Sequence, residues 1–272
     1  MNLKMIATDM DGTFLTDDKK YNVDRFREQL KFMEKKGIRF VAASGNQYQH
    51  LYDIFAPVND QFQIDFVADN GARIFTGADL LYESPVSSEQ LRRIIEWNAQ
   101  NPGSLDNLII LSGAESAYVS NHATPTTLAE VSTFYAPIKQ VEKLLEVPDN
   151  VFKVTFVWPD MAVEKYVIQL RNIFGEELHA TGSGFGSVDL LAKEVNKAHG
   201  ISRLQREYGI ETADIVAFGD NDNDLEMLNY VDQGYLMPNA YKWMREQINL
   251  RALNDNNHEG VLDTIEQLLG EV

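Results

Sequence analysis

Two aspartates near the N-terminus stand at a spacing that could support chemistry. Asp9 and Asp11 follow the apolar residues 5–8 and precede Gly12 and Thr13. The apolar run is typical of a buried strand, and on extended backbone both carboxylates would point to one side. Two carboxylates held so close resist joint ionisation unless a cation lies between them or one keeps a proton. The stretch is therefore a candidate site, although Asp and Gly also form ordinary turns after strands.

A second acidic segment follows another apolar run late in the chain. Residues 219–224 read Gly-Asp-Asn-Asp-Asn-Asp and come directly after residues 215–218, which have the composition of a buried strand. If the two strands are neighbours in one sheet, Asp220 comes close to Asp9. Oxygen ligands without histidine or cysteine suit Mg²⁺, which usually shares its ligands with a phosphate. An acidic loop can also simply cap the following helix, but two such loops at two strand ends favour a metal.

A phosphate at such a site would need a fixed cation and hydrogen-bond donors. Lys197 stands at the start of a predicted helix, and Ser44-Gly45 follows a predicted strand. The hydroxyl and the backbone N–H of this pair form a plausible phosphate grip before a helix. Lysines usually lie on the solvated surface, and Ser-Gly pairs are common in turns, so each residue also has an ordinary interpretation.

The elements that must position these residues alternate between strand and helix. Apolar runs predict strands at 5–8, 38–43 and 66–68, separated by helices over about 22–36 and 47–55. This alternation is typical of a parallel, doubly wound sheet. Ligands of such sheets bind beyond the carboxyl ends of the strands. The first acidic pair and the Ser-Gly pair both follow strands, where such a site is expected.

The alternation changes in the middle of the chain. After Ser84-Pro85, interpreted as a linker, the pattern twice gives a helix followed by paired strands, which predicts an α+β sheet with helices on one face. The predicted helices lie at 89–100, at one or two places between 125 and 145, and at 161–173; the predicted strands lie at 108–111, 117–119, 151–158, 178–180 and 187–191.

The first alternation returns at Asn196, with a helix to Gly209, the strand at 215–218 and a closing helix over 259–269. The predicted fold class is therefore α/β, a Rossmann-like core with a doubly wound parallel sheet. We expect residues 1–83 and 191–272 to form this core, and residues 84–190 to form an inserted α+β domain.

Composition limits the partners. The chain has 272 residues with 24 Lys+Arg against 41 Asp+Glu, a formal charge of -17. This excess repels nucleic acid and anionic membranes, so we expect neither as a partner. There is no cysteine, no apolar run of membrane-spanning length and no recognisable signal peptide. These features predict a cytoplasmic protein; its oligomeric state is open, and a monomer is plausible.

Four segments, taken in order, resemble the motifs of the haloacid dehalogenase superfamily of phosphotransferases. Residues 9–13 (Asp-Met-Asp-Gly-Thr) are similar to its first motif, Ser44 to its second, Lys197 to its third and residues 219–224 to its fourth. The insertion is similar to the type IIB cap of the Cof-type sugar phosphatases. The resemblance covers essentially the whole chain, including residues 70–72 and 256–261.

The resemblance implies the roles of the two N-terminal aspartates. Asp9 would attack phosphorus and form an aspartyl-phosphate. Asp11 would protonate the leaving oxygen and then take a proton from the hydrolytic water.

The resemblance also implies a cofactor and a phosphate site. Mg²⁺ would be held by Asp9, the Asp11 backbone carbonyl and Asp220, and Asp224 would orient the metal-bound waters. The phosphoryl oxygens would be held by the Met10 backbone N–H, Ser44, Gly45, Lys197 and Asn223. The implied reaction is hydrolysis of a small phosphorylated metabolite, a sugar phosphate, and the cap would select the leaving group.

Departures from the family pattern affect substrate contacts. Many Cof-type members have arginine where this chain has Asn46, and glycine where it has Ala198. Candidates for leaving-group contacts in the insertion are Tyr118, Ser183, Phe185 and Asp189; for Tyr118 and Phe185 an ordinary place in the cap core is the stronger interpretation.

Three other functions remain as alternatives. A phosphomutase shares this cap type but must protect its aspartyl-phosphate from water. A regulatory module phosphorylated on Asp9 also combines acidic residues with Ser or Thr and Lys, but such modules are shorter and have no large insertion. A dehalogenase fits poorly because Asp11 is present.

Overall fold

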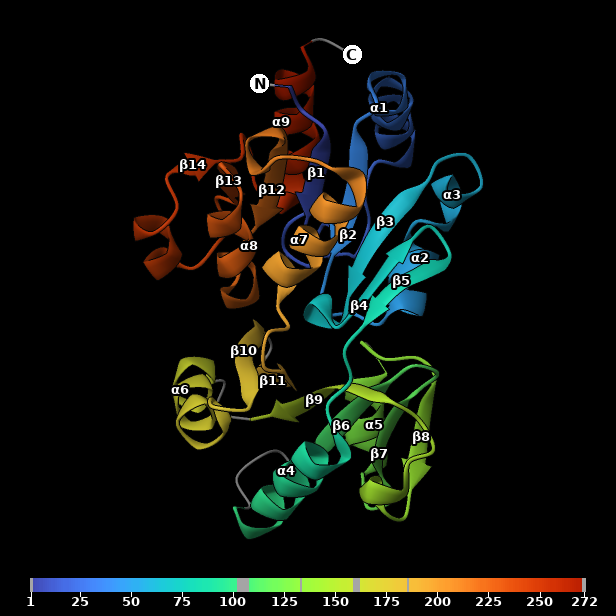
Figure 1. Cartoon of the computed structure of the whole chain (residues 1–272), viewed down its shortest axis with the longest axis vertical. Helices are drawn as coiled ribbons and strands as arrows, with labels where there is room; N and C mark the ends of the chain where they lie inside the picture. The colour runs from blue at the N-terminus through green and yellow to red at the C-terminus, as the bar shows by residue number, and fades with distance from the viewer. Residues whose placement is uncertain (1, 102–107, 133, 159–161, 185, 271–272) are drawn as a thin grey trace. The chain divides into compact units, whose positions relative to one another are not determined.

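The computed structural model describes residues 2–101, 108–132, 134–158, 162–184 and 186–270. The chain forms two compact units: Met1–Leu81 with Asn196–Val272, here called the core unit, and Tyr82–Val195, here called the inserted unit (Figure 1). That the inserted unit selects the substrate stays a prediction. Of the helices that are described, none is both long and apolar enough to span a bilayer.

The core unit is built on an eight-stranded sheet with the order β14-β13-β12-β1-β2-β3-β4-β5. The strands are β1 (Met5–Thr8), β2 (Arg39–Ala43), β3 (Ile64–Ala68), β4 (Arg73–Thr76), β5 (Asp79–Glu83), β12 (Ile215–Gly219), β13 (Gln233–Leu236) and β14 (Leu250–Arg251).

The chain leaves β1 in both directions along this sheet. From β1 it proceeds to β2 and β3 on one side, and on its return it adds β12, β13 and β14 on the other, all in parallel pairs. Met5 is level with both Arg39 and Ile215, so the carboxyl ends of β1, β2 and β12 lie at one edge. The predicted doubly wound fold is confirmed, and the change of direction between β1 and β12 is where ligands of such sheets bind.

One part of this sheet was not predicted. β4 pairs antiparallel with β3, and β5 follows at the edge. β5 is mostly exposed or half-buried, so it lacks the continuous apolar run that reveals a buried parallel strand.

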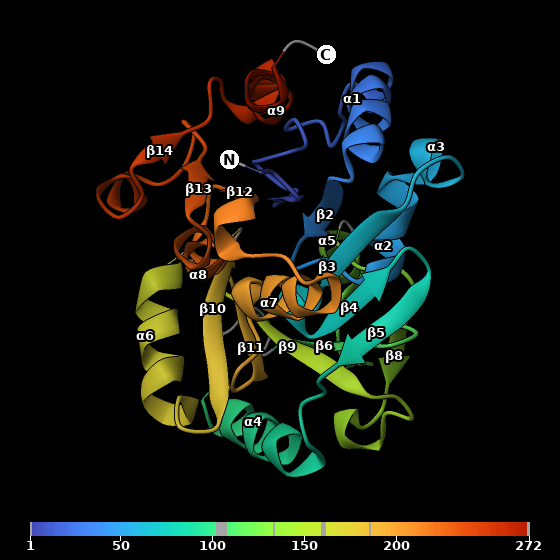
Figure 2. The same cartoon turned by 45° about the horizontal axis from the view of Figure 1, so that its top comes forward.

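Helices cover both faces of the core sheet. The helices α1 (Val23–Lys36), α2 (Tyr48–Ile54), α3 (Ala56–Asn59) and α9 (Gly260–Leu269) share one apolar cluster with alternate strand residues such as Phe66. On the other face lie α7 (Lys197–Tyr208) and α8 (Leu225–Tyr230), which pack side by side (Figures 1 and 2). A Cβ atom on Gly200 of α7 would lie 2.3 Å from the Val67 side chain, so glycine permits this close helix-to-sheet packing.

The inserted unit has a six-stranded sheet with the order β10-β11-β9-β6-β7-β8. Its strands are β6 (Ile109–Gly113), β7 (Ala117–Ser120), β8 (Ile138–Val141), β9 (Val151–Val157), β10 (Leu178–Gly184) and β11 (Ser187–Ala192), and its helices are α4 (Ser88–Gln100), α5 (Pro125–Val131) and α6 (Val163–Phe174). Strand β8 lies in the region for which the sequence predicts one or two helices, so a strand takes the place of the second helix.

The prediction that all helices of this unit lie on one face is wrong. Ile109 and Leu111 of β6 share an apolar cluster with residues of α4 and α6. Ile110, which points the opposite way along the strand, belongs to a second cluster with Val131 of α5. Because both faces of β6 are apolar, both need a covering layer.

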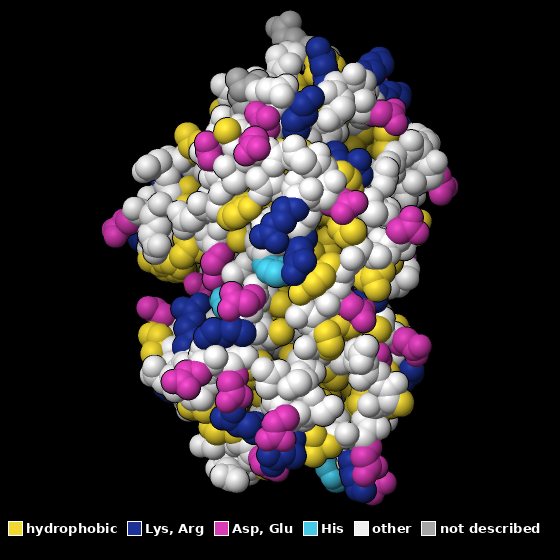
Figure 3. Space-filling view, viewed as in Figure 1, with side chains coloured by type: hydrophobic (Ala, Val, Ile, Leu, Met, Phe, Trp, Pro, Cys, Tyr) yellow, Lys and Arg dark blue, Asp and Glu magenta, His cyan; other side chains and the backbone are white. Residues whose placement is uncertain are grey.

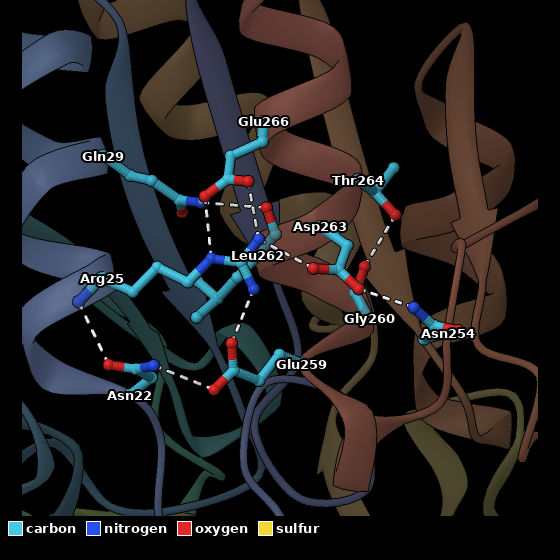
Figure 4. Close-up of polar contacts among 10 residues, drawn as sticks. All are labelled: Asn22, Arg25, Gln29, Asn254, Glu259, Gly260, Leu262, Asp263, Thr264 and Glu266. Carbon is cyan, nitrogen blue, oxygen red and sulfur yellow. Dashed lines mark hydrogen bonds and ion pairs between the residues drawn. The ribbon is translucent and has the colours of Figure 1, made fainter. Parts of the chain in front are cut away.

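Figure 4 shows a polar network that joins the first and last helices of the core unit. Arg25 of α1 forms ion pairs with Glu259 (2.6 Å), Asp263 (2.7 Å) and Glu266 (2.7 Å) at and within α9. The buried Gln29 donates from Nε2 to the Leu262 carbonyl (2.9 Å). The hydrogen bond from Arg25 lowers the pKa of Glu266. The network fixes α9 against α1.

We predict that Arg25→Met destabilises the core unit by about 2 kcal/mol, because hydrogen bonds to charged groups contribute about 1.5–3 kcal/mol and three carboxylates would lose their partner. Urea unfolding would measure the loss. The matched control is Lys31→Met on the same helix, where an exposed pair with Glu28 is removed, with an expected change of at most about 0.5 kcal/mol. Equal losses in the two variants would contradict the prediction.

Candidate active site

Strand β1 delivers Asp9 to the edge of the sheet where the chain changes direction. The Asp9 backbone N–H donates to the Phe218 carbonyl of β12 (2.9 Å), and the residue is only 5 % exposed. The strand ends at Thr8, and the Phe14 N–H returns to the Asp9 carbonyl (3.2 Å). Residues 9–14 therefore form turns, so the extended backbone expected between Asp9 and Asp11 does not continue.

The turn after Asp9 closes on the second acidic segment. Thr13 Oγ1 donates to Asp220 Oδ1 (2.7 Å). Gly12 has a φ of +82°, and a Cβ atom there would lie 2.7 Å from Asp220 Oδ2. Both the backbone conformation and the close approach therefore require glycine at this position. The expected proximity of the two acidic segments is present, and Thr13 adds a contact that the sequence reasoning did not include.

Lys197 lies fully buried among these carboxylates. Its Nζ is 2.5 Å from Asp9 Oδ1 and 2.6 Å from Asp224 Oδ1. Figure 3 shows Lys and Arg side chains on the outer surface over α7, where Arg206 is exposed. Lys197 is on the same helix but belongs to its buried first turn. The usual surface position of lysine does not apply here.

Asp224 holds the loop that carries Asp220. Its Oδ2 accepts from the backbone N–H groups of Asp220 (2.9 Å) and Asn221 (3.0 Å), while its Oδ1 accepts from Lys197. A Cβ atom on Gly219 would lie 2.5 Å from that of Asp224, so the strand end and the loop meet closely. Asp224 thus joins the acidic loop to the buried ammonium.

The charges of this cluster do not balance. Among the described residues, Asp9, Asp220 and Asp224 each offer an oxygen within 4.8 Å of the others. Three carboxylates and one ammonium sum to a formal charge of minus two. Burial, followed by the charge of Asp224, raises the pKa of Asp9, and the same causes raise the pKa of Asp220 to about 7. Burial alone would lower the pKa of Lys197, but Asp224 and Asp9 outweigh it and raise that pKa.

This donor set fits a divalent cation. The ligand atoms are carboxylate oxygens, as Mg²⁺ prefers, and a double positive charge would offset the excess negative charge. The acidic triad Asp9, Asp220 and Asp224 could therefore bind a metal.

Asp11 is not a member of the buried triad, although its charge also raises the pKa of Asp220. Its carboxylate accepts from Asn46 Nδ2 (3.0 Å) and pairs with Lys19 Nζ (2.5 Å), and its side chain is 27 % exposed. Sequence reasoning noted Asn46 as a departure and did not include Lys19. Only the turn pattern after Thr13 could have suggested that Lys19 returns toward the site.

Three further residues predicted to bind phosphate, Ser44, Gly45 and Asn223, lie around Asn70. Ser44 is buried, and its Oγ accepts from the Asn46 backbone N–H (3.1 Å). Asn223 is 9 % exposed and donates to Asn70 Oδ1 (2.9 Å). A Cβ atom on Gly45 would lie 3.3 Å from the same Asn70 side chain. Asn70, which the sequence reasoning quoted without a role, therefore connects these residues.

Met10 separates the two aspartates. Its side chain is fully buried in the core cluster, and its carbonyl accepts from the Thr13 (3.3 Å) and Leu15 (2.9 Å) backbone N–H groups. These bonds fix the turn whose Met10 backbone N–H is predicted to bind a phosphoryl oxygen.

Two of the four candidates in the inserted unit have side-chain partners within that unit. Tyr118 is 2 % exposed and donates to Asp149 Oδ2 (3.0 Å). Asp189 is fully buried, accepts from Thr155 Oγ1 (2.6 Å) and pairs with Lys153 (3.4 Å). Ser183 lies half-buried in β10; Phe185 lies outside the described residues.

The fold and the site together define a class: an α/β enzyme with an acidic site and a buried lysine at the carboxyl edge of a doubly wound sheet. Haloacid dehalogenase-like hydrolases match residues 6–265 of the chain. The chain is 34% identical over 269 residues to 5-amino-6-(5-phospho-D-ribitylamino)uracil phosphatase YbjI of Escherichia coli K12, covering 99% of this chain and 97% of that protein. It is 23% identical over 266 residues to the HMP-PP phosphatase of Klebsiella pneumoniae strain 342, covering 95% and 93%.

A solved structure is similar to this chain in both fold and sequence. SMU.1108c from Streptococcus mutans UA159 superposes with a TM-score of 0.92 at 31% identity, covering 99% of this chain and 100% of that one. The chain belongs to the haloacid dehalogenase-like hydrolase family. The superfamily resemblance carried by the four motifs is confirmed, and the protein is an enzyme of the phosphatase type that its relatives represent.

We predict that the stability of the metal-free protein falls as the pH rises from about 4 to 7. The pKa of Asp220 is about 7 in the folded state against 3.8 in the absence of its neighbours. Between these values the folded state binds more protons than the unfolded state, so stability decreases with rising pH.

The test is urea unfolding in EDTA at the two ends of this range. Asp220→Asn should remove part of the decrease, on the order of 1–2 kcal/mol. A decrease of the same size in the variant would refute the assignment to Asp220.

Proposed function

We propose that this enzyme hydrolyses small phosphate monoesters with Mg²⁺ through an aspartyl-phosphate on Asp9. The observation that carries the proposal is the contact of a buried carboxylate with a buried ammonium, beside two further carboxylates at the sheet edge. An isolated buried charge is costly, and this cluster is suited to a phosphate and a cation. Relatives whose names describe phosphatases support the same reaction.

In the first half-reaction, an Asp9 carboxylate oxygen attacks phosphorus. Lys197 contacts Oδ1, which leaves Oδ2 as the candidate attacking atom. The new bond joins Asp9 to phosphorus while the bond from phosphorus to the ester oxygen breaks. Asp11 gives its proton to that oxygen, which leaves as an alcohol.

In the second half-reaction, water attacks the phosphorus of the aspartyl-phosphate. Asp11, now ionised, takes a proton from the water, and inorganic phosphate leaves with the regeneration of the Asp9 carboxylate. The Asp11 carboxylate is partly exposed to water, and its contacts with Asn46 and Lys19 favour the ionised form that this half-reaction uses.

The phosphoryl oxygens require positive charge and donors. Lys197 supplies the charge. The hydrogen bonds come from four donors: Ser44 Oγ, Asn223 Nδ2 and the backbone N–H groups of Gly45 and Met10. Donors fixed before the reaction stabilise charge that develops in the transition state.

Asp9, Asp220 and the Asp11 carbonyl would hold the Mg²⁺. When bound, this ion supplies positive charge that offsets the carboxylates and polarises a phosphoryl oxygen. Asp224 fits the role of an orienting residue, because its oxygens accept from Lys197 and two backbone N–H groups.

For the substrate class we propose a small phosphorylated metabolite with a sugar or sugar-alcohol chain. The name of the Escherichia coli relative describes a substrate with a phosphorylated ribityl chain. The resemblance of residues 44–48 and 183–186 to the bacterial sugar phosphatase SupH favours the same class. The inserted unit would select the leaving group, and we expect the enzyme to work in the cytoplasm.

We predict that Asp9→Asn lowers phosphate release by at least about 10³-fold, because the amide is a poor nucleophile. The measurement is phosphate release from a panel of sugar and ribityl phosphates, with and without Mg²⁺. The matched control is Asp60→Asn, which changes an exposed aspartate of the core unit. Full activity of Asp9→Asn would overturn the nucleophile assignment, and conversion of a sugar 1-phosphate to a 6-phosphate without phosphate release would indicate a phosphomutase.

We predict that Asp11→Asn affects poor leaving groups most. An alkyl phosphate needs protonation of its leaving oxygen, whereas p-nitrophenolate leaves without it. The rate of aspartyl-phosphate formation, measured in single turnovers, should fall about 10²-fold or more with an alkyl phosphate and much less with p-nitrophenyl phosphate. Equal losses with both substrates would argue against a role of Asp11 as general acid.

A further inference from the structure

A strained turn follows β3 in the core unit. Asp69, Asn70 and Gly71 all have positive φ values, of 48°, 55° and 100°. Asn and Asp tolerate this left-handed conformation better than other residues with side chains, but a run of such residues persists only where the surroundings fix it. A Cβ atom on Gly71 would lie 2.2 Å from the Asn196 carbonyl. The turn therefore packs directly against the start of α7, next to Lys197.

The backbone of this turn is tied to the loop after β2. The Asn70 N–H donates to the Ser44 carbonyl (2.9 Å), and the Asp69 N–H donates to the Asn46 carbonyl (2.9 Å). Both bonds are to residues on either side of Gly45. They require the left-handed turn, because the turn aims two successive N–H groups at one loop.

The Asn70 side chain extends the connection to the acidic loop. Asn70 is 1 % exposed, and its Oδ1 accepts from Asn223 Nδ2 (2.9 Å) in a buried hydrogen bond. The space that a Cβ atom on Gly45 would occupy lies 3.3 Å from both Asn70 Nδ2 and Oδ1. One side chain thus packs on the backbone of the Ser-Gly pair and holds the amide of Asn223.

We propose that Asn70 is a positioning residue for phosphate binding. It fixes Asn223 relative to Ser44 and Gly45, the donors that the proposed function assigns to the phosphoryl oxygens, and the inference rests on that function. Donors placed before binding cost no reorganisation when charge develops. An asparagine suits the position because it combines tolerance of positive φ with an amide that accepts from Asn223 and lies over Gly45.

The test separates the side chain from the strained backbone. Asn70→Gly keeps the left-handed conformation at no steric cost and removes the amide. With saturating Mg²⁺ and p-nitrophenyl phosphate as the substrate, we expect kcat/KM to fall by about tenfold or more. This is the size of effect seen when a residue that hydrogen-bonds to a direct ligand, and so orients it, is replaced. The inhibition constant of orthovanadate, which mimics the transition state, should rise by a similar factor. The unfolding temperature should stay well above the assay temperature, because the loss of one buried hydrogen bond costs only about 1–3 kcal/mol.

A second variant tests whether Asn70 acts through Asn223. Asn223→Ala should weaken orthovanadate binding. When Asn70→Gly is added to Asn223→Ala, the inhibition constant should rise much less than it does when Asn70→Gly is made alone. The matched control is Glu259→Gly, which changes another left-handed residue (φ 55°) whose side chain belongs to the Arg25 network. It should leave kcat/KM and orthovanadate inhibition unchanged.

Two results would overturn the proposal. Asn70→Gly could keep the kcat/KM and orthovanadate inhibition of the unchanged enzyme, or the losses of the two single variants could multiply in full in the double variant. Failure of the proposed function is distinguishable, because the unchanged enzyme would then release no phosphate with Mg²⁺. If that enzyme also fails to bind orthovanadate, the inference about Asn70 fails with it.

Discussion

The structure of the core unit depends on one buried ammonium that contacts two buried carboxylates. Lys197 reaches Asp9 at the end of β1 and Asp224 in the loop after β12. These residues are far apart in sequence, and the ion pairs tie the returning segment of the chain to its first strand. Removing one partner of a buried ion pair leaves an uncompensated charge, which is strongly destabilising. Together with Asp220, these residues have a net negative formal charge that a divalent cation could neutralise.

Sequence reasoning could place Asp9, Ser44 and Asp220 because each follows a continuous apolar strand, and parallel strands present their carboxyl ends at one edge. It could place Lys197 only through a superfamily resemblance, since a lysine on a helix usually faces solvent. Strands β4 and β5, at one end of the strand order, were missed because β4 has only four residues and β5 is largely exposed. The covering of both faces in the inserted unit was missed because alternate residues of β6 serve two separate clusters.

Contacts made by single side chains across the fold were harder to predict. Thr13 and Asn70 each contact a proposed site residue in another loop, and Lys19 contacts Asp11 from farther along the same loop. Their positions depend on left-handed or turn backbone rather than on strand periodicity, and periodicity is what a sequence pattern reveals best. Asn70 illustrates the point: an Asn-Gly pair predicts a turn, but not which two loops the turn connects.

In the proposed reaction, phosphoryl transfer occurs in two displacements through Asp9, each of which inverts the configuration at phosphorus. The most direct measurement uses a phosphate monoester made chiral at phosphorus with oxygen isotopes. Transfer to an acceptor alcohol, followed by stereochemical analysis of the product, reports the number of displacements. Two displacements predict net retention of configuration. Net inversion would show that the acceptor attacks the substrate directly, and would contradict a covalent intermediate on Asp9.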